Sequence, residues 1–270
     1  MPKNVIIVGA PRSGTSMTAL IFTKKGYFVT EDNDNDLQSA NEFNPDGFWE
    51  ASGLRDSNEQ LFHKIGFPFA NTWLFDVIKE EQANEILNID TLDKHQQLVE
   101  DYNKKSPWMW KDPNLCYTIG YWWRLMNPET TGILFLKRNP EEIYKSFLRL
   151  EWCKPGKNDK EKTMKRINHH IDYAEMILSK NNIPHLTVNY AEYATSPELT
   201  AKRISEYFDL ELTVADLGFN KKYNTSGMRG HLMRWGNWLG NMMPNSLRKV
   251  LKKLLPTFVL KIIFPMRYTK

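Results

Sequence analysis

The chain has 270 residues, of which 41% are hydrophobic and 25% are charged, and its formal net charge is +4. This composition is ordinary for a globular protein, and the length is sufficient for a core that needs neither disulfides nor a structural metal ion. The mild positive charge favours anionic ligands but is too small to indicate binding of nucleic acid.

Only two cysteines are present, Cys116 and Cys153. They are too few for a disulfide framework or a zinc site, which favours a reducing compartment. No run of 18 apolar residues predicts a membrane-spanning helix, and the N-terminal apolar run is too short for a signal sequence. We therefore expect a cytoplasmic protein.

The first predicted element is a strand at 4–9, because NVIIVG is a continuous β-branched run of the kind found in buried parallel strands. A glycine-containing loop follows, and then a helix over 16–26 that ends at Gly26. The next predictions are a strand at 27–30, an acidic polar loop at 31–47, and helices at 51–65 and 78–104.

The second half of the chain alternates strands and helices more clearly. A short apolar strand within 107–113 stops at a charged pair, and a second strand begins at 131. Asn139 is placed to cap a helix that begins at Pro140 with two glutamates in its first turn. The remaining predicted elements are a helix at 159–181, a strand at 185–190 and a helix at 196–210.

This order of strands and helices predicts an α/β fold with three layers, an open parallel sheet with helices on both faces. No repeat or low-complexity linker divides the chain, so 1–270 is predicted to be a single domain. Its last part, 244–270, combines Arg248, Lys249, Lys252, Lys253 and Lys261 with Leu, Phe and Ile. We expect a basic amphipathic helix there, which either packs on the core or lies on an anionic membrane surface.

The stretch VGAPRSGTSM at 8–17 is close to the P-loop pattern G-x-x-x-x-G-K-[ST]. Thr15 stands where that pattern has lysine, and Arg12 lies inside the loop. Backbone N–H groups at the start of the following helix favour an anion, and an arginine suits a tetrahedral oxyanion. The predicted anion-binding loop consists of Pro11, Arg12, Ser13, Gly14, Thr15 and Ser16.

A second candidate site lies in FLKRNPEEIYKS, at the end of the strand that begins at 131. Nucleoside triphosphatases usually have a magnesium-binding aspartate at such a strand end, but here the strand ends in Lys137 and Arg138. Ser146 lies two helical turns further on, on the face that looks back to the strand end. We expect Arg138 and Ser146 to bind one anion together.

A third set of charged residues lies at other predicted strand ends and loops. NPDGFWE at 44–50 contains Asp46 and Glu50, and WKDPN at 110–114 contains Lys111 and Asp112. The carboxyl ends of parallel strands surround the ligand crevice in open α/β sheets, so a carboxylate there is placed to act as a general base. For Asp46 a surface or capping role is the better interpretation.

These motifs together resemble those of the sulfotransferases that use 3′-phosphoadenosine-5′-phosphosulfate (PAPS), particularly the bacterial members, over about residues 4–210. The resemblance implies a P-loop-like sulfotransferase fold. It implies that the loop from Pro11 to Ser16 holds the 5′-phosphosulfate and that Arg138 and Ser146 hold the 3′-phosphate. It also assigns Arg229 to the loop that closes on the 3′-phosphate, although the lysine of cytosolic members is missing here.

The family's chemistry is transfer of a sulfuryl group to an acceptor hydroxyl or amine, with no metal required. The resemblance implies an acceptor that is a glycan, a glycolipid or a small molecule. It favours Glu50 as the base, with Asp112 and His63 as alternatives, and Arg12 and Lys111 as the cations that stabilise developing charge.

Two other functions remain open at this stage. One is a P-loop kinase acting on a small metabolite, which would bind ATP with magnesium. The other is a nucleotide-binding relative that has lost catalysis. A sugar-stacking surface is a further option for some of the nine tryptophans, although most of them are expected in the core.

Overall fold

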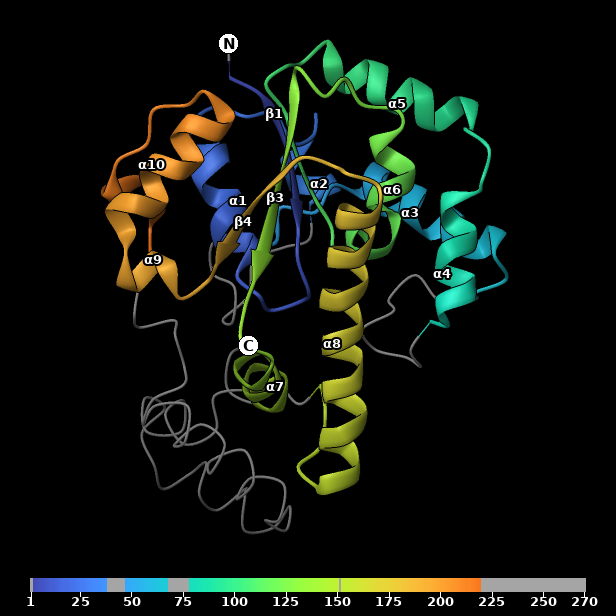
Figure 1. Ribbon diagram of the computed structural model, residues 1–270. Coiled ribbons are helices and arrows are strands. Elements are labelled where there is room, and N and C mark those ends of the chain that lie inside the picture. The colour runs from blue at the N-terminus through green and yellow to red at the C-terminus, as the bar shows by residue number, and fades with distance from the viewer. Residues whose placement is uncertain (1, 38–46, 68–77, 151, 220–270) are drawn as a thin grey trace, which may run out of the picture.

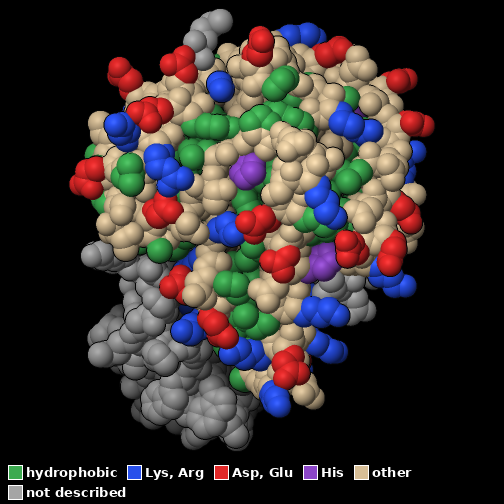
Figure 2. All heavy atoms as spheres, viewed as in Figure 1, with side chains coloured by type: hydrophobic (Ala, Val, Ile, Leu, Met, Phe, Trp, Pro, Cys, Tyr) green, Lys and Arg blue, Asp and Glu red, His purple; other side chains and the backbone are tan. Residues whose placement is uncertain are grey.

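The computed structural model describes residues 2–37, 47–67, 78–150 and 152–219, and the statements below concern those residues. Asp46, Arg229 and the helix expected at 244–270 lie outside them. On the face seen in Figure 2, acidic and basic side chains are interspersed over the described residues. This face therefore presents no large region of one charge.

The centre of the fold is a four-stranded sheet in which all paired strands are parallel, in the order β2-β1-β3-β4. The strands are β1 (Asn4–Val8), β2 (Met109–Lys111), β3 (Thr131–Lys137) and β4 (His185–Asn189). In register, Ile7 pairs with both Lys111 and Leu134, and Lys137 pairs with Asn189. The strand ends that carry the predicted site residues therefore lie at one edge of the sheet.

Helices cover both faces of the sheet, which confirms the expected three-layer α/β fold (Figure 1). On one face lie α1 (Thr15–Lys24), α9 (Glu192–Thr195) and α10 (Pro197–Phe208), with the 3₁₀ helix η1 (Val214–Leu217) beside them. On the other lie α3 (Ser52–Lys64), α4 (Glu80–Leu87), α5 (Asp93–Asn103), α6 (Leu115–Trp123) and α8 (Lys157–Lys180). The remaining helices are α2 (Asn33–Asp36) and α7 (Pro140–Arg149).

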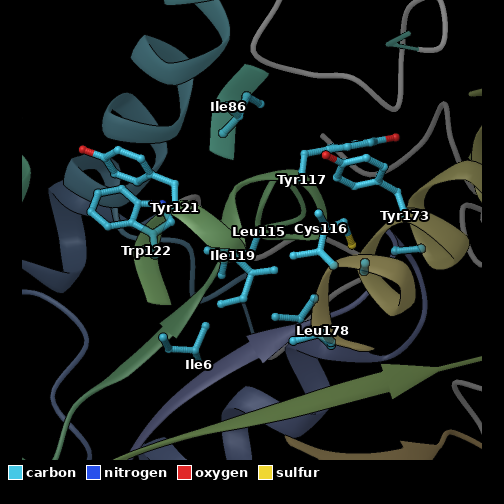
Figure 3. Packing of buried hydrophobic residues seen from close by; sticks show 14 of the residues in the cluster. Ile6, Ile86, Leu115, Cys116, Tyr117, Ile119, Tyr121, Trp122, Tyr173 and Leu178 are labelled. Carbon is cyan, nitrogen blue, oxygen red and sulfur yellow. The ribbon is translucent and has the colours of Figure 1, made fainter. Parts of the chain in front are cut away.

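Alternate residues of the central strands enter two separate cores, because successive side chains of a strand point to opposite faces. Val5 and Ile7 pack with α1 and α10, whereas Ile6 and Val8 pack with the larger group of helices. Figure 3 shows Leu115 and Ile119 of α6 with Leu178 of α8 in the larger core, close to Ile6 of β1. Trp108, Trp110 and Trp122 are fully buried there, as expected for most of the tryptophans.

Three sequence expectations are corrected by the structure. Residues 27–30 form a single bridge, between Phe28 and Trp108, instead of a strand, because the Val29 carbonyl accepts from the Tyr102 hydroxyl at 2.6 Å. The helix expected over 78–104 is broken at 88–92 into α4 and α5, where Asn88 and Asp90 favour a turn. The loop expected at 31–47 contains the short helix α2.

Helix α6 was not predicted from the sequence, because its residues LCYTIGYWW show no polar face. Eight of its nine residues are buried, from Leu115 to Trp122. The sequence therefore lacks the alternation of apolar and polar residues, with a period of 3.6, that predicts an amphipathic helix. Most other helices begin and end close to the expected residues. Asn139 caps α7 as predicted, since its side chain accepts from the Glu141 N–H at 2.9 Å.

Candidate active site

The loop between β1 and α1 has the form of an anion-binding turn. Arg12 and Gly14 both adopt a positive φ, of 66° and 104°, and the Ser13 N–H donates to the Ala10 carbonyl at 3.0 Å. This turn leads directly into α1, whose first N–H groups have no acceptor within the helix. The buried Ser13 hydroxyl has no hydrogen-bond partner among the described residues. The loop thus offers donors to a ligand.

Gly14 is required by a close contact as well as by its backbone angle. A Cβ atom added to Gly14 would lie 2.4 Å from the ring of Tyr190, which follows β4. On Tyr190 the guanidinium of Arg138 stacks at 4.2 Å from the ring centroid. The glycine, the tyrosine ring and the arginine therefore connect the loop to the ends of β3 and β4.

The structure brings the two predicted anion-binding motifs into direct contact, although they are more than a hundred residues apart. Arg12 Nε donates to Ser146 Oγ at 3.2 Å. Arg138 donates from Nη1 to the Arg12 carbonyl at 3.1 Å, and from Nε to Glu142 at 2.9 Å. Arg12 therefore contacts both Arg138 and Ser146.

Sequence reasoning missed Arg149, the last residue of α7. Its Nη2 donates to Ser146 Oγ at 3.3 Å, and its side chain is buried. Its spacing from Ser146 could have indicated it, because residues three apart on a helix lie on one face. Burial, then Arg149 and then Arg138 lower the pKa of Arg12 to about 10. The guanidinium groups of Arg149 and Arg138 thus lie close enough to Arg12 to lower its pKa.

A second polar group connects Glu50 and Lys111 with the loop. The Lys111 ammonium forms a buried ion pair with Glu50 and donates to Ser16 Oγ at 3.3 Å. Ser16 Oγ also lies 3.5 Å from the Phe48 carbonyl, to which it donates. A lysine ammonium from strand β2 thus lies beside the loop.

Asp112 lies next to this ion pair and is almost fully buried. Its Oδ1 accepts from the Asn114 N–H at 2.7 Å and from Asn58 Nδ2 at 3.2 Å. Burial, followed by the charge of Glu50, raises the pKa of Asp112 to about 7. The site thus holds two carboxyl groups in different environments.

His63 is not brought to the loop. It is half exposed at the end of α3, 3.7 Å from Glu59. It lines a surface hollow of about 590 Å³ together with Gln60, Lys64, Leu92, Asp93 and Lys94, none of which belongs to the loop or to a strand end. His63 is therefore not placed with the other candidate residues.

Neither a metal cluster nor a membrane span is found in the part of the chain that the structure describes. There, no three His, Cys, Asp or Glu side chains are grouped so that they could hold a metal ion. None of the described helices is both long enough and apolar enough to cross a bilayer.

Comparison with known proteins identifies the family. Among solved structures, the chain is similar to the sulfotransferase domain of the Synechococcus PCC 7002 olefin synthase, with 13% identity, a TM-score of 0.46, and coverage of 95% of this chain and 94% of that one. It is also similar to the sulfotransferase STF9 from Mycobacterium avium, with 14% identity, a TM-score of 0.43, and coverage of 98% and 75%. Comparison with curated proteins gave no match. The model of the sulfotransferase family matches residues 2–214, and the chain therefore belongs to the sulfotransferase family.

Proposed function

We propose that this protein transfers the sulfuryl group of PAPS to a hydroxyl or amine of a glycan, a glycolipid or a small molecule. The observation that carries the proposal is the contact of Arg12 with Ser146. It joins the loop that follows β1 to helix α7, which begins just after Arg138 and ends at Arg149. A nucleotide with separate 5′ and 3′ anionic groups needs two such adjoining sites.

The residues present fit this donor. On the 5′ side, the buried Ser13 hydroxyl and the first turn of α1 offer donors, with Pro11, Arg12, Gly14, Thr15 and Ser16 completing the loop. On the 3′ side, Arg138 and Ser146 would hold the phosphate. Arg229 belongs to this proposal as well, although it lies outside the described residues. No step of the proposed reaction requires a metal ion.

The donor supplies the sulfuryl group, which passes from a phosphate oxygen to the acceptor oxygen or nitrogen. Glu50 is the proposed base, which takes the proton of the attacking acceptor group. Glu50 is more exposed than Asp112, 9% against 3%, and Asp112 Oδ1 already accepts two hydrogen bonds. Glu50 is therefore the carboxylate that an acceptor reaches more easily.

Lys111 connects the base to the loop in this mechanism. It donates both to Glu50 and to Ser16 Oγ, so its position responds to the charge on Glu50. When Glu50 takes a proton, its attraction for the ammonium weakens. The positive charge of Lys111, together with that of Arg12, then stabilises the negative charge on the leaving phosphate side.

The test is calorimetric titration with adenosine 3′,5′-bisphosphate in EDTA, compared with ATP and magnesium. We expect the bisphosphate to bind without metal, and Arg138→Ala to weaken it about tenfold or more, as loss of a charge-assisted hydrogen bond predicts. Arg55→Ala, at a half-exposed position on α3, is the control. ATP–magnesium binding alone would favour a metabolite kinase, and bisphosphate binding without transfer to any acceptor would indicate an inactive relative.

The proposal also places the protein in the cytoplasm, with the C-terminal segment 244–270 as a peripheral contact to an anionic membrane surface. This suits a glycolipid or lipid-linked acceptor. Flotation with anionic liposomes should be lost when 244–270 is deleted, and unchanged flotation would remove the membrane contact from the proposal.

A further inference from the structure

Arg149 is a buried arginine that the family motifs leave without a role. It ends α7, its side chain is 6% exposed, and it donates to Ser146 Oγ. Arg12 Nε donates to the same oxygen, at 3.2 Å. One neutral hydroxyl thus receives two cationic donors that come from different elements.

The Ser146 hydroxyl is thereby oriented. A serine hydroxyl has two acceptor lone pairs and one proton to donate. The guanidiniums of Arg12 and Arg149 occupy the lone pairs, so the proton points in the remaining direction. Within the described residues no acceptor receives that proton. Ser146 is therefore set to donate to an oxygen that the chain itself does not provide.

The same arrangement has an electrostatic cost. Arg149 and Arg138 both disfavour the charged form of Arg12, which is also buried. Like charges in a partly desolvated place repel more strongly than on the surface. An anion with two charges reduces this cost more than an anion with one, and a phosphate monoester near neutral pH carries close to two.

We propose that Arg149 is a further guanidinium ligand of the 3′-phosphate, beside Arg138, and that it makes this site select nucleotides that carry a 3′-phosphate monoester. The inference rests on the proposed function, since it concerns the same donor site. It adds a specificity residue from the end of α7 to the pair Arg138 and Ser146. The 5′ side of the nucleotide is not expected to depend on Arg149.

The test compares two ligands that differ only at the 3′ position, adenosine 3′,5′-bisphosphate and adenosine 5′-monophosphate. Calorimetry in EDTA gives the ratio of their affinities for each variant. Arg149→Met should lower this ratio about 10- to 100-fold, the range expected for a charge-assisted hydrogen bond, with little change in monophosphate affinity. Arg149→Lys should lower it less, because lysine keeps the charge but cannot donate as a fork.

The control is Arg203→Met on α10, which removes a half-buried guanidinium that donates to Glu192 at 2.6 Å. It should leave the ratio unchanged. Equal weakening of both ligands by Arg149→Met, or no weakening, would show a structural role at the end of α7 and overturn the inference. If Arg149→Met does not fold, a ratio for Arg149→Lys equal to that of wild type overturns it. A wild-type protein that does not prefer the bisphosphate would instead refute the proposed function itself.

Discussion

Lys111 and Glu50 form an ion pair in the interior of the protein, although 61 positions separate them in the chain. Their side chains are only 4% and 11% exposed. Lys111 ends β2, and Glu50 stands two residues before α3. Breaking a buried pair leaves an uncompensated charge, so each partner constrains what can replace the other.

Glu50→Gln is the first prediction. Glutamine keeps an oxygen that accepts from Lys111, but it cannot take a proton from an acceptor group. We expect sulfuryl transfer to fall about 10²- to 10⁴-fold, the range for loss of a general base, with bisphosphate affinity unchanged. The measurement is release of adenosine 3′,5′-bisphosphate from the donor in the presence of an acceptor that the wild type uses.

Glu59→Gln, at a half-exposed position on α3, is the control for this substitution and should keep the wild-type rate. If Glu50→Gln keeps its rate while Asp112→Asn loses it, the base is Asp112. That outcome would reassign the mechanism without affecting the donor site.

Asp112→Asn gives a prediction for the dependence of stability on pH. Burial raises the pKa of Asp112 to about 7, so the folded state binds its proton more tightly than the unfolded state does. Its contribution to the free energy of unfolding therefore decreases as pH rises from about 4 to about 7, by at most about 1.4 kcal/mol per unit. Asparagine does not titrate, and its Oδ1 can still accept from Asn58 and Asn114.

The measurement is urea unfolding of wild type and Asp112→Asn at several pH values. Buried His95 and His170, whose pKa values burial lowers to about 4, act in the opposite direction, so the difference between the two proteins is the informative quantity. The stability of Asp112→Asn relative to wild type should increase with pH over this window. A difference independent of pH would mean that Asp112 is ionised in the fold throughout.

Gly14→Ala separates a steric contact from backbone strain. Gly14 has a φ of 104°, and an added Cβ would also lie 2.4 Å from the Tyr190 ring. Gly26 has a φ of 84° with no atom within 4 Å of an added Cβ, so Gly26→Ala measures strain alone. We expect a loss of stability of about 1 kcal/mol for Gly26→Ala and about 3 kcal/mol for Gly14→Ala.

Thermal or urea unfolding of both variants provides the comparison. The double variant Gly14→Ala with Tyr190→Ser should recover part of the loss, since the ring is no longer in the way. Equal losses for the two alanine variants would show that Tyr190 moves aside at little cost. The contact would then not fix the loop.

The layers of the fold and the position of the loop could be predicted from the sequence, because the signals are local. The β-branched run at 4–8 and the cap at Asn139 depend on neighbouring residues alone. Helix α6 could not be predicted in this way, since it is buried on nearly all sides. The prediction of a strand at 27–30 was also wrong, because the hydrogen bond from the Tyr102 hydroxyl to the Val29 carbonyl depends on long-range packing.

The candidate site shows the same division. The motifs selected Arg12, Arg138 and Ser146, with Arg138 and Ser146 expected to bind one anion together, but they did not indicate which side chains contact Ser146. In the structure Arg12 and Arg149 make that contact. The pairing of Glu50 with Lys111 depends on where a loop crosses the end of β2, and no local pattern in either segment encodes it.

Asn58 is the centre of a buried polar network behind the site. Its Oδ1 accepts from Thr118 Oγ1 and from Trp122 Nε1, both at 2.8 Å, and its Nδ2 donates to Asp112. Asn58→Leu is close in size but leaves these groups without their partner. We expect a loss of about 2–4 kcal/mol in unfolding free energy, since each buried unsatisfied group costs about 1–3 kcal/mol.

Asn58→Asp tests the contact between residue 58 and Asp112. An aspartate can still accept from Thr118 and Trp122, but two carboxyl groups then face each other and one needs a proton. The variant should therefore lose stability as pH rises towards neutrality. In the double variant Asn58→Asp with Asp112→Asn, only one carboxyl group remains at this contact, so the repulsion between two carboxyl groups is removed. Urea unfolding at neutral pH should find the double variant more stable than Asn58→Asp alone; if it is not, the bond between these two side chains does not hold Asp112 in place.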